Sequence, residues 1–324
     1  MRISFCLPQE HVPDADWVKA LLAGKPLLLK QGGGVATNQC WIYQTWTLLI
    51  TTGTRCYAFS QLPAEGIIVT LSGALPTPCK TPDKAFLVAI VADGRPHPLA
   101  HFHIVQNKAH AERLPQVFFM PHWPQPGLVP RDPKRGSRFE SISFFGYSNN
   151  LAAELRSPQW RQRLQEELGL QLHLPEVHTW YDYSQTDCVL AIRDFSKSRH
   201  FHKPATKLYD AWHAGVPFIG GRDSAYAADG NPGEDYLVAT SPEEVFQHLK
   251  HLKTNEAFRA SLVEKGFQTG ANFTQEATLQ RWRILMEETL PTLASDWQLA
   301  STKRRSWFSI TQRFLCWADR LLRS

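Results

Sequence analysis

The sequence predicts an α/β protein made of two domains, each built on a parallel sheet. Short apolar runs alternate with helix-like segments, which is typical of parallel sheets covered by helices on both faces. At 324 residues the chain is long enough for about two domains with separate cores. A stretch rich in proline and charge, Pro121 to Arg138, interrupts the alternation and is the expected connection between the domains.

The first domain is expected to span residues 1–125, followed by a linker at 126–138. Helical segments are predicted at residues 14–23 and 38–52, and Gly53 ends the second of them. The apolar runs that predict strands lie at residues 3–7, 57–60, 67–71, 86–91, 102–106 and 117–120.

The second domain is expected to span residues 139–292, and a basic amphipathic helix is expected over 293–324. A long helix is predicted at 151–168, and further helices from residue 242 onward. Strands are predicted at residues 142–145, 171–174, 188–193, 216–219 and 236–239.

The composition predicts a soluble globular protein and disfavours membrane-spanning, secreted and zinc-binding proteins. Charged residues make up 20% and apolar residues 43%, as in soluble globular proteins, and no run of about 18 uncharged apolar residues could span a bilayer. The N-terminal MRISFCLPQEH is more typical of a first strand than of a signal peptide, so a cytoplasmic location is expected. Six cysteines lie singly without a C-x-x-C pair, which argues against a zinc site and gives no reason for disulfides.

The net charge of +5 comes entirely from the C-terminal tail. Its charged residues are the bases Lys303, Arg304, Arg305, Arg313, Arg320 and Arg323 and the acid Asp319. Because the rest of the chain sums to zero, nucleic acid is not an expected partner. Trp307, Ile310, Phe314, Trp317 and Leu321 recur at steps of three and four and would form one apolar helix face. That face either packs on the protein or lets residues 303–323 bind an anionic membrane from its inner side.

The segment from Lys203 to Tyr226 has the features of an anion site. A helix over 203–214 would place Lys203, Lys207 and Asp210 on one face, with both ammonium groups at its N-terminal end. Pro204 would then occupy an early helical position, and a short buried strand would follow the helix.

The turn that follows this strand supports the same hypothesis. The next helix opens after Gly220-Gly221 with Ser224 as its expected N-cap, which would leave backbone N–H groups facing the loop. A diphosphate could bind there without a metal ion. The alternative is an ordinary solvated pair of lysines beside an ordinary αβ turn.

The run KPATKLYDAWHAGVPFIGG, residues 203–221, resembles the donor-binding segment of GT-B glycosyltransferases. In that family an acidic residue precedes an A-G-x-P turn, and a lysine or arginine lies one turn earlier; Asp210 and Lys207 take these positions. The resemblance extends over about residues 140–290 by motif order and implies two Rossmann-like domains with parallel sheets facing across a cleft. It also implies that Asp210 holds the ribose, Lys207 the diphosphate, and Ser224 with neighbouring amides the phosphate oxygens.

The motif departs from the pattern of retaining families, in which two glutamates flank this helix. His202 stands eight residues before Asp210, so the sequence leaves the stereochemistry open. The donor site expected from motif and resemblance comprises Gly33, Gly146, Tyr147, Ser148, Lys203, Lys207, Asp210, Asp223, Ser224, Ala225 and Tyr226. Gly33 belongs to a glycine-rich loop that could equally be a plain turn, and residues 145–149 follow a strand end that should face the crevice.

Catalytic roles are expected for Asp93, Arg193 and Lys207. Asp93 follows an apolar strand and could deprotonate the acceptor hydroxyl, although Asp-Gly is also a common turn. His103 alternates with apolar residues within a strand and is expected to be structural. Arg193 follows another strand and, with Lys207, could stabilise the charge on the leaving diphosphate; a surface salt bridge is its competing role.

These observations predict a glycosyltransferase that moves a sugar from a UDP- or GDP-linked donor to a glycan, lipid-linked or small-molecule hydroxyl acceptor. No cofactor or metal is expected. The alternative from another class is a non-catalytic nucleotide- or carbohydrate-binding protein on the same scaffold. A dinucleotide-dependent oxidoreductase is disfavoured because no G-x-G-x-x-G follows a strand.

Overall fold

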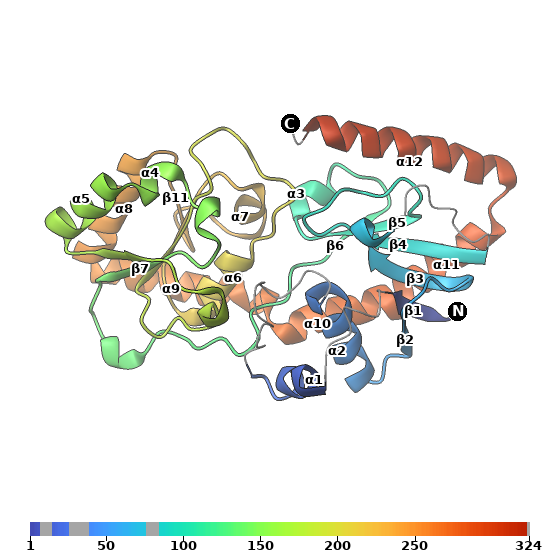
Figure 1. Cartoon of the computed structure of the whole chain (residues 1–324), viewed down its shortest axis with the longest axis horizontal. Helices are drawn as coiled ribbons and strands as arrows, with labels where there is room; N and C mark the ends of the chain where they lie inside the picture. The colour runs from blue at the N-terminus through green and yellow to red at the C-terminus, as the bar shows by residue number, and fades with distance from the viewer. Residues whose placement is uncertain (7–14, 26–38, 76–83, 323–324) are drawn as a thin grey trace.

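The computed structural model describes residues 1–6, 15–25, 39–75 and 84–322 and has two lobes, each with a fully parallel sheet (Figure 1). The N-terminal lobe contains six strands in the order β2-β1-β3-β4-β5-β6. These strands are β1 (Ile3–Cys6), β2 (Cys56–Phe59), β3 (Glu65–Leu71), β4 (Lys84–Ile90), β5 (Phe102–Val105) and β6 (Val117–Phe119). The four inner strands β1, β3, β4 and β5 are almost entirely buried, as expected for strands covered on both faces, whereas the edge strands β2 and β6 are partly exposed.

The C-terminal lobe contains five strands in the order β11-β10-β9-β7-β8. These strands are β7 (Ser141–Ser143), β8 (Gln171–His173), β9 (Cys188–Ala191), β10 (Phe218–Gly220) and β11 (Leu237–Val238). All eleven predicted strands are therefore present, with bounds that differ by a few residues, and the predicted α/β class is confirmed.

The helices surround these sheets. In the N-terminal lobe they are α1 (Ala15–Leu22), the π-helix η2 (Gln39–Gln44), α2 (Thr45–Thr51) and α3 (Lys108–Ala111). In the C-terminal lobe they are α4 (Ala153–Arg156), α5 (Pro158–Leu168), α6 (Thr206–Ala214), α7 (Ser224–Asp229), α8 (Pro242–Thr254) and α9 (Glu256–Gly270). The C-terminal segment contains α10 (Gln275–Ile284), η8 (Leu285–Thr289), α11 (Leu290–Leu299) and α12 (Thr302–Leu322).

Three helix predictions were wrong. The C-terminal helix expected over 293–324 is replaced by two helices, α11 and α12, because the chain is extended at Ala300. The single helix expected over 151–168 is broken between α4 and α5, because Pro158 has no N–H to continue a helix and instead occupies the first turn of α5, where Ser157 caps the Trp160 N–H. The helix expected from Lys203 begins only at Thr206. Before it, His200 has φ of 45° and accepts a hydrogen bond from the Lys203 N–H, so the chain turns here.

The C-terminal segment returns to the N-terminal lobe. In Figure 1, α10 runs from the C-terminal lobe toward α2, and α11 lies behind the N-terminal sheet. Trp282, Leu285, Met286 and Leu290 are fully buried in the same core as strands β1, β3 and β4. Several residues between Trp282 and Ala294 are therefore part of the N-terminal core, although they follow the C-terminal lobe in the sequence.

Close packing of α6 against α9 fixes the orientation of the donor-segment helix. Trp212 of α6 is 2% exposed and lies against Gly266, where a Cβ atom would come within 2.5 Å of the indole. Its Nε1–H donates to the Asp235 carbonyl at 2.9 Å. Because the Trp212 face of α6 packs on α9, Lys207 and Asp210 lie on the other side of the helix, toward the N-terminal lobe.

Candidate active site

The carboxyl ends of the two parallel sheets meet, and polar contacts join the lobes there. Asp93, after β4, pairs with the Lys203 ammonium at 2.8 Å. Gln106, after β5, donates to the His202 carbonyl at 2.9 Å. Asn107 donates to the Lys203 carbonyl at 3.1 Å. In open α/β sheets, ligands bind at such strand ends, so this junction is the candidate active site.

Lys207 is a half-buried cation of this junction. It lies in the first turn of α6 with its Cε beside Gly146 and its Nζ 5.5 Å from the centre of the Phe144 ring. Among the residues that the structure describes, no carboxylate oxygen lies within 4 Å of its ammonium. Burial and, next, the Arg193 charge lower its pKa to about 8, although the side chain keeps some access to solvent.

Arg193 and Asp223 form an ion pair beside this lysine. They follow β9 and β10, and the Arg193 Nε donates to Asp223 Oδ1 at 3.0 Å. The Asp223 side chain is only 2% exposed, so the guanidinium is held by a carboxylate that lies in the protein interior. Because Nε is the nitrogen engaged, the two Nη atoms are the groups that Arg193 can direct at an anion.

Asp210 lies one turn beyond Lys207, in a buried position. Its Oδ1 accepts a hydrogen bond from the Gln125 N–H at 3.0 Å, so the carboxylate contacts the start of the linker. Burial raises its pKa to about 7, against the opposing effects of this hydrogen bond and of Lys207. The predicted role in holding a ribose remains a prediction.

The Asp93 residue is exposed, and two side chains donate hydrogen bonds to its carboxylate. Gln106 Nε2 donates to Oδ1 at 2.7 Å, and the Lys203 ammonium reaches Oδ2. Desolvation raises the pKa of the carboxyl, but Lys203 and Gln106 outweigh it and the pKa lies below its ordinary value. The preceding Ala92 has φ of 46°, and strained backbone of this kind is often found at functional strand ends.

The anion site predicted at the start of α7 has a different N-cap in the structure. Ser224 is the first residue of α7 rather than its N-cap. Its N–H donates to the Arg199 carbonyl at 2.7 Å, so this amide is already used, whereas its hydroxyl accepts from Asn107 at 2.9 Å and keeps its own O–H to donate. The predicted contact of the hydroxyl with a phosphate oxygen remains a prediction. Ala225 and Tyr226 are 0% and 1% exposed, and their side chains belong to the hydrophobic core.

The remaining predicted site residues lie in different surroundings. Gly146 contacts Lys207, as described, while Tyr147 and Ser148 are exposed on the loop after β7. The Tyr147 ring meets Trp180 edge-on at 5.2 Å. Lys203 lies outside α6 in its ion pair with Asp93, and Gly33 lies outside the described residues.

Sequence reasoning missed four residues of the junction. Gln106 and Asn107 directly follow a strand, so the rule that selected Asp93 could also have found them. His122 and Cys40 come together only in the fold, with Cys40 Sγ 3.3 Å from His122 Nε2. Burial lowers the pKa of His122 and raises that of Cys40, so both groups are neutral near pH 7. His103 is structural, as predicted, and hydrogen-bonds to the His97 backbone.

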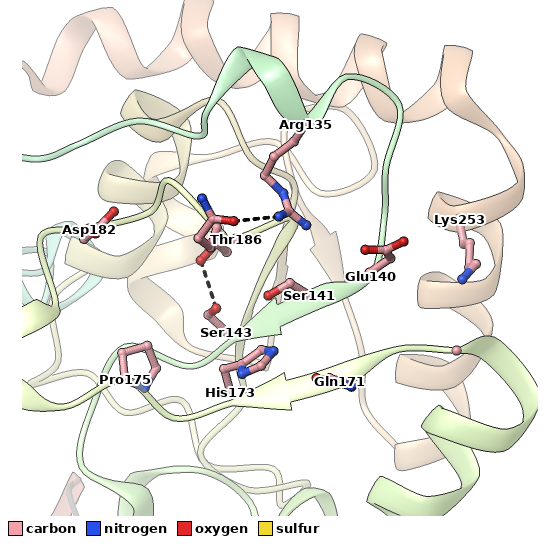
Figure 2. Close-up of a pocket in the computed structure, with 12 residues that line it drawn as sticks. Arg135, Glu140, Ser141, Ser143, Gln171, His173, Pro175, Asp182, Thr186 and Lys253 are labelled. Atoms are coloured by element: carbon pink, nitrogen blue, oxygen red, sulfur yellow. Dashed lines mark hydrogen bonds between the residues drawn. The ribbon is translucent and has the colours of Figure 1, made fainter.

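A hollow of about 520 Å³ in the C-terminal lobe lies over polar side chains of β7 and β8 (Figure 2). Two of its lining residues are cationic. Arg135 is paired with Asp187 at 2.6 Å, and Lys253 donates to the Leu168 carbonyl at 2.5 Å. Because both cations are engaged, this hollow is a poorer diphosphate site than the junction. Within the described ranges, no group of three or more His, Cys, Asp or Glu is arranged to hold a metal ion.

Donor binding is expected to weaken above about pH 8. The pKa of Lys207 is lowered from 10.5 to about 8, and only its ammonium form attracts a diphosphate. The attraction is therefore nearly complete below about pH 7 and is lost as the pH rises through about 8. Calorimetric titration with a donor across about pH 6 to 9 would measure the effect. In Lys207→Arg the cation stays charged, so an equal decline in that variant would contradict the assignment.

Comparison with known proteins agrees with this geometry. Residues 142–284 match the glycosyl transferase-like family model. No curated protein matches the chain significantly in sequence. In structure, the chain is similar to Anabaena HepE in complex with UDP-glucose (TM-score 0.54, 12% identity, 90% of this chain and 100% of that chain). It is also similar to sucrose-phosphate synthase from Thermosynechococcus elongatus (TM-score 0.55, 12% identity, 90% and 100%).

A third similar structure is S. aureus TarM bound to UDP and α-GlcNAc-glycerol (TM-score 0.51, 8% identity, 76% of this chain), of which the chain spans 59%. The protein thus has the GT-B fold of glycosyltransferases. Its C-terminal lobe matches the glycosyl transferase-like family, which confirms the resemblance first seen in residues 203–221.

Proposed function

We propose that the protein is a glycosyltransferase that moves a sugar from a nucleotide diphosphate donor, linked to UDP or GDP, to a hydroxyl group of an acceptor. The observation that supports this most is Lys207, a cation without a carboxylate partner among the described residues, at the meeting point of two sheets in a GT-B fold. Similar structures bind UDP or UDP-glucose according to their descriptions. The acceptor is proposed to be a glycan, a lipid-linked sugar or a small molecule.

In the proposed reaction the acceptor oxygen bonds to the anomeric carbon while the bond from that carbon to the phosphate oxygen breaks. The nucleotide diphosphate leaves with both electrons of the broken bond. Lys207 and the Nη atoms of Arg193 stabilise the negative charge that builds on it, so no metal ion is required. A hexose is the proposed sugar.

Asp93 is proposed to accept the proton of the acceptor hydroxyl. It is exposed at a strand end of the N-terminal lobe, opposite the diphosphate-binding side chains. Its ion pair with Lys203 lowers its pKa, so this pair has to open or shift before Asp93 becomes an effective base.

Asp93→Asn and Lys203→Met are expected to have different effects on turnover. Loss of the base would lower kcat by about 10²–10⁴-fold in Asp93→Asn. Lys203→Met would keep most of the activity, because it removes only the partner of the base. Initial-rate kinetics of both variants would test this, and equal losses in the two would mean that Asp93 only joins the lobes.

The decisive test of the function is a panel of UDP- and GDP-linked sugars incubated with the protein, with release of free nucleotide diphosphate as the readout. Slow hydrolysis of one donor without acceptor, lost in Lys207→Ala, is the expected result. Binding of nucleotides with no turnover under any condition would favour the non-catalytic binding protein instead.

A further inference from the structure

Helix α12 presents its large apolar side chains to solvent instead of to the protein. Trp307 is 71%, Ile310 63%, Phe314 61% and Trp317 54% exposed. They recur at steps of three and four, so they form a single stripe along the helix. The sequence left two alternatives for this face, and the one in which it packs on the protein is wrong for these four residues.

A different side of α12 holds it to the N-terminal lobe. Phe308 meets Trp297 edge-on at 4.9 Å and stacks on His101 at 6.0 Å. Arg305 donates to the Trp297 carbonyl at 3.0 Å, and Gln312 is only 3% exposed. Because these three residues are also spaced at three and four, they define a docked side of the helix opposite the exposed stripe. Figure 1 shows α12 along the outside of this lobe.

The charges of α12 suit an anionic partner. Residues 303–323 carry six basic residues and one acidic residue. Two of the basic residues, Lys303 and Arg313, are exposed near the stripe, four residues before Trp307 and three after Ile310. No helix in the described part of the chain is long and apolar enough to cross a membrane. An amphipathic helix with aromatic side chains and flanking cations is the form that lies within a lipid interface.

We propose that α12 docks on an anionic lipid bilayer, with Trp307, Ile310, Phe314 and Trp317 inserted at the level of the headgroups. Lys303 and Arg313 would then reach the lipid phosphates beside the stripe. A second copy of the chain fits this face less well, because a two-fold contact would bring two strongly basic helices together. The proposal is independent of the proposed reaction.

Flotation of the full chain with vesicles tests this proposal. The vesicles contain phosphatidylcholine alone or a mixture with phosphatidylglycerol. The expected result is binding to the mixed vesicles, with a blue shift of tryptophan fluorescence and loss of binding at high salt. The double variant Trp307→Ser, Phe314→Ser should lose binding. Lys303→Ala and Arg313→Ala should each weaken it about five-fold, and both together more.

Tyr57→Ser is the matched control, because Tyr57 is 48% exposed on the same lobe but outside α12. It should bind vesicles like the parent, and all variants should keep the parent unfolding temperature. The proposal is overturned if the parent does not bind the mixed vesicles, or if the double variant binds them equally well. Light scattering that shows a dimer without lipid, abolished by the double variant, would instead assign the stripe to a second copy.

Discussion

Replacing Lys207 by alanine is expected to abolish the stabilisation of the protein by a sugar nucleotide and to lower turnover by about 10²–10³-fold. Among the residues that the structure describes, no carboxylate oxygen lies within 4 Å of this ammonium, so its charge is available to the diphosphate. Because burial already lowers its pKa, its removal should leave the unliganded protein as stable as before, or more so. Thermal unfolding with and without donor would measure both effects.

Lys197→Ala is the control for this experiment. Lys197 lies in the loop before α6, also carries a positive charge, and is exposed. A general loss of positive potential would affect both variants alike, whereas a specific diphosphate contact affects only Lys207. An unchanged donor-induced shift in Lys207→Ala would exclude the proposed site.

Arg193→Gln is expected to lower kcat by about 10²–10³-fold with a smaller change in KM. Asp223 engages the Nε atom of Arg193. In the proposed reaction the two Nη atoms would contact the leaving group, whose charge is greatest in the transition state. Steady-state kinetics with varied donor would separate the two parameters. Asp223→Asn keeps Arg193 but weakens its positioning, so we expect a smaller loss of kcat in that variant. A change confined to KM in Arg193→Gln would mean that the arginine contributes only to ground-state binding.

The strands could be predicted from the sequence because buried parallel strands are short apolar runs that depend little on the rest of the fold. The breaks in helices were harder to predict. Pro158 gave a local signal that was available and overlooked, whereas the late start of α6 depends on the turn at His200, which contacts Asp194 at 3.1 Å. This contact lies within the loop between β9 and α6, and the helical spacing used for the prediction carries no information about the conformation of that loop.

The candidate active site could also be predicted only in part from the sequence. Lys207, Arg193 and Asp93 all follow the simple rule that polar residues after parallel strands or at the start of the next helix face the crevice. Ser224 fits the same rule, yet its amide already donates to the Arg199 carbonyl, and its hydroxyl accepts a hydrogen bond from Asn107 of the N-terminal lobe. Which donors remain unused depends on the opposite lobe, about which the motif itself carries no information.

The return of the chain to its first lobe has a consequence for biosynthesis. Trp282, Leu285, Met286 and Leu290 fill space between α2 and the first sheet, so that lobe stays incomplete until the ribosome has translated beyond them. Apolar surface of the N-terminal lobe therefore stays uncovered on the nascent chain until these residues have left the ribosome. We expect this lobe to complete its folding late, although N-terminal domains usually fold first. Residues 282–290 thus complete a core whose strands are synthesised much earlier in translation.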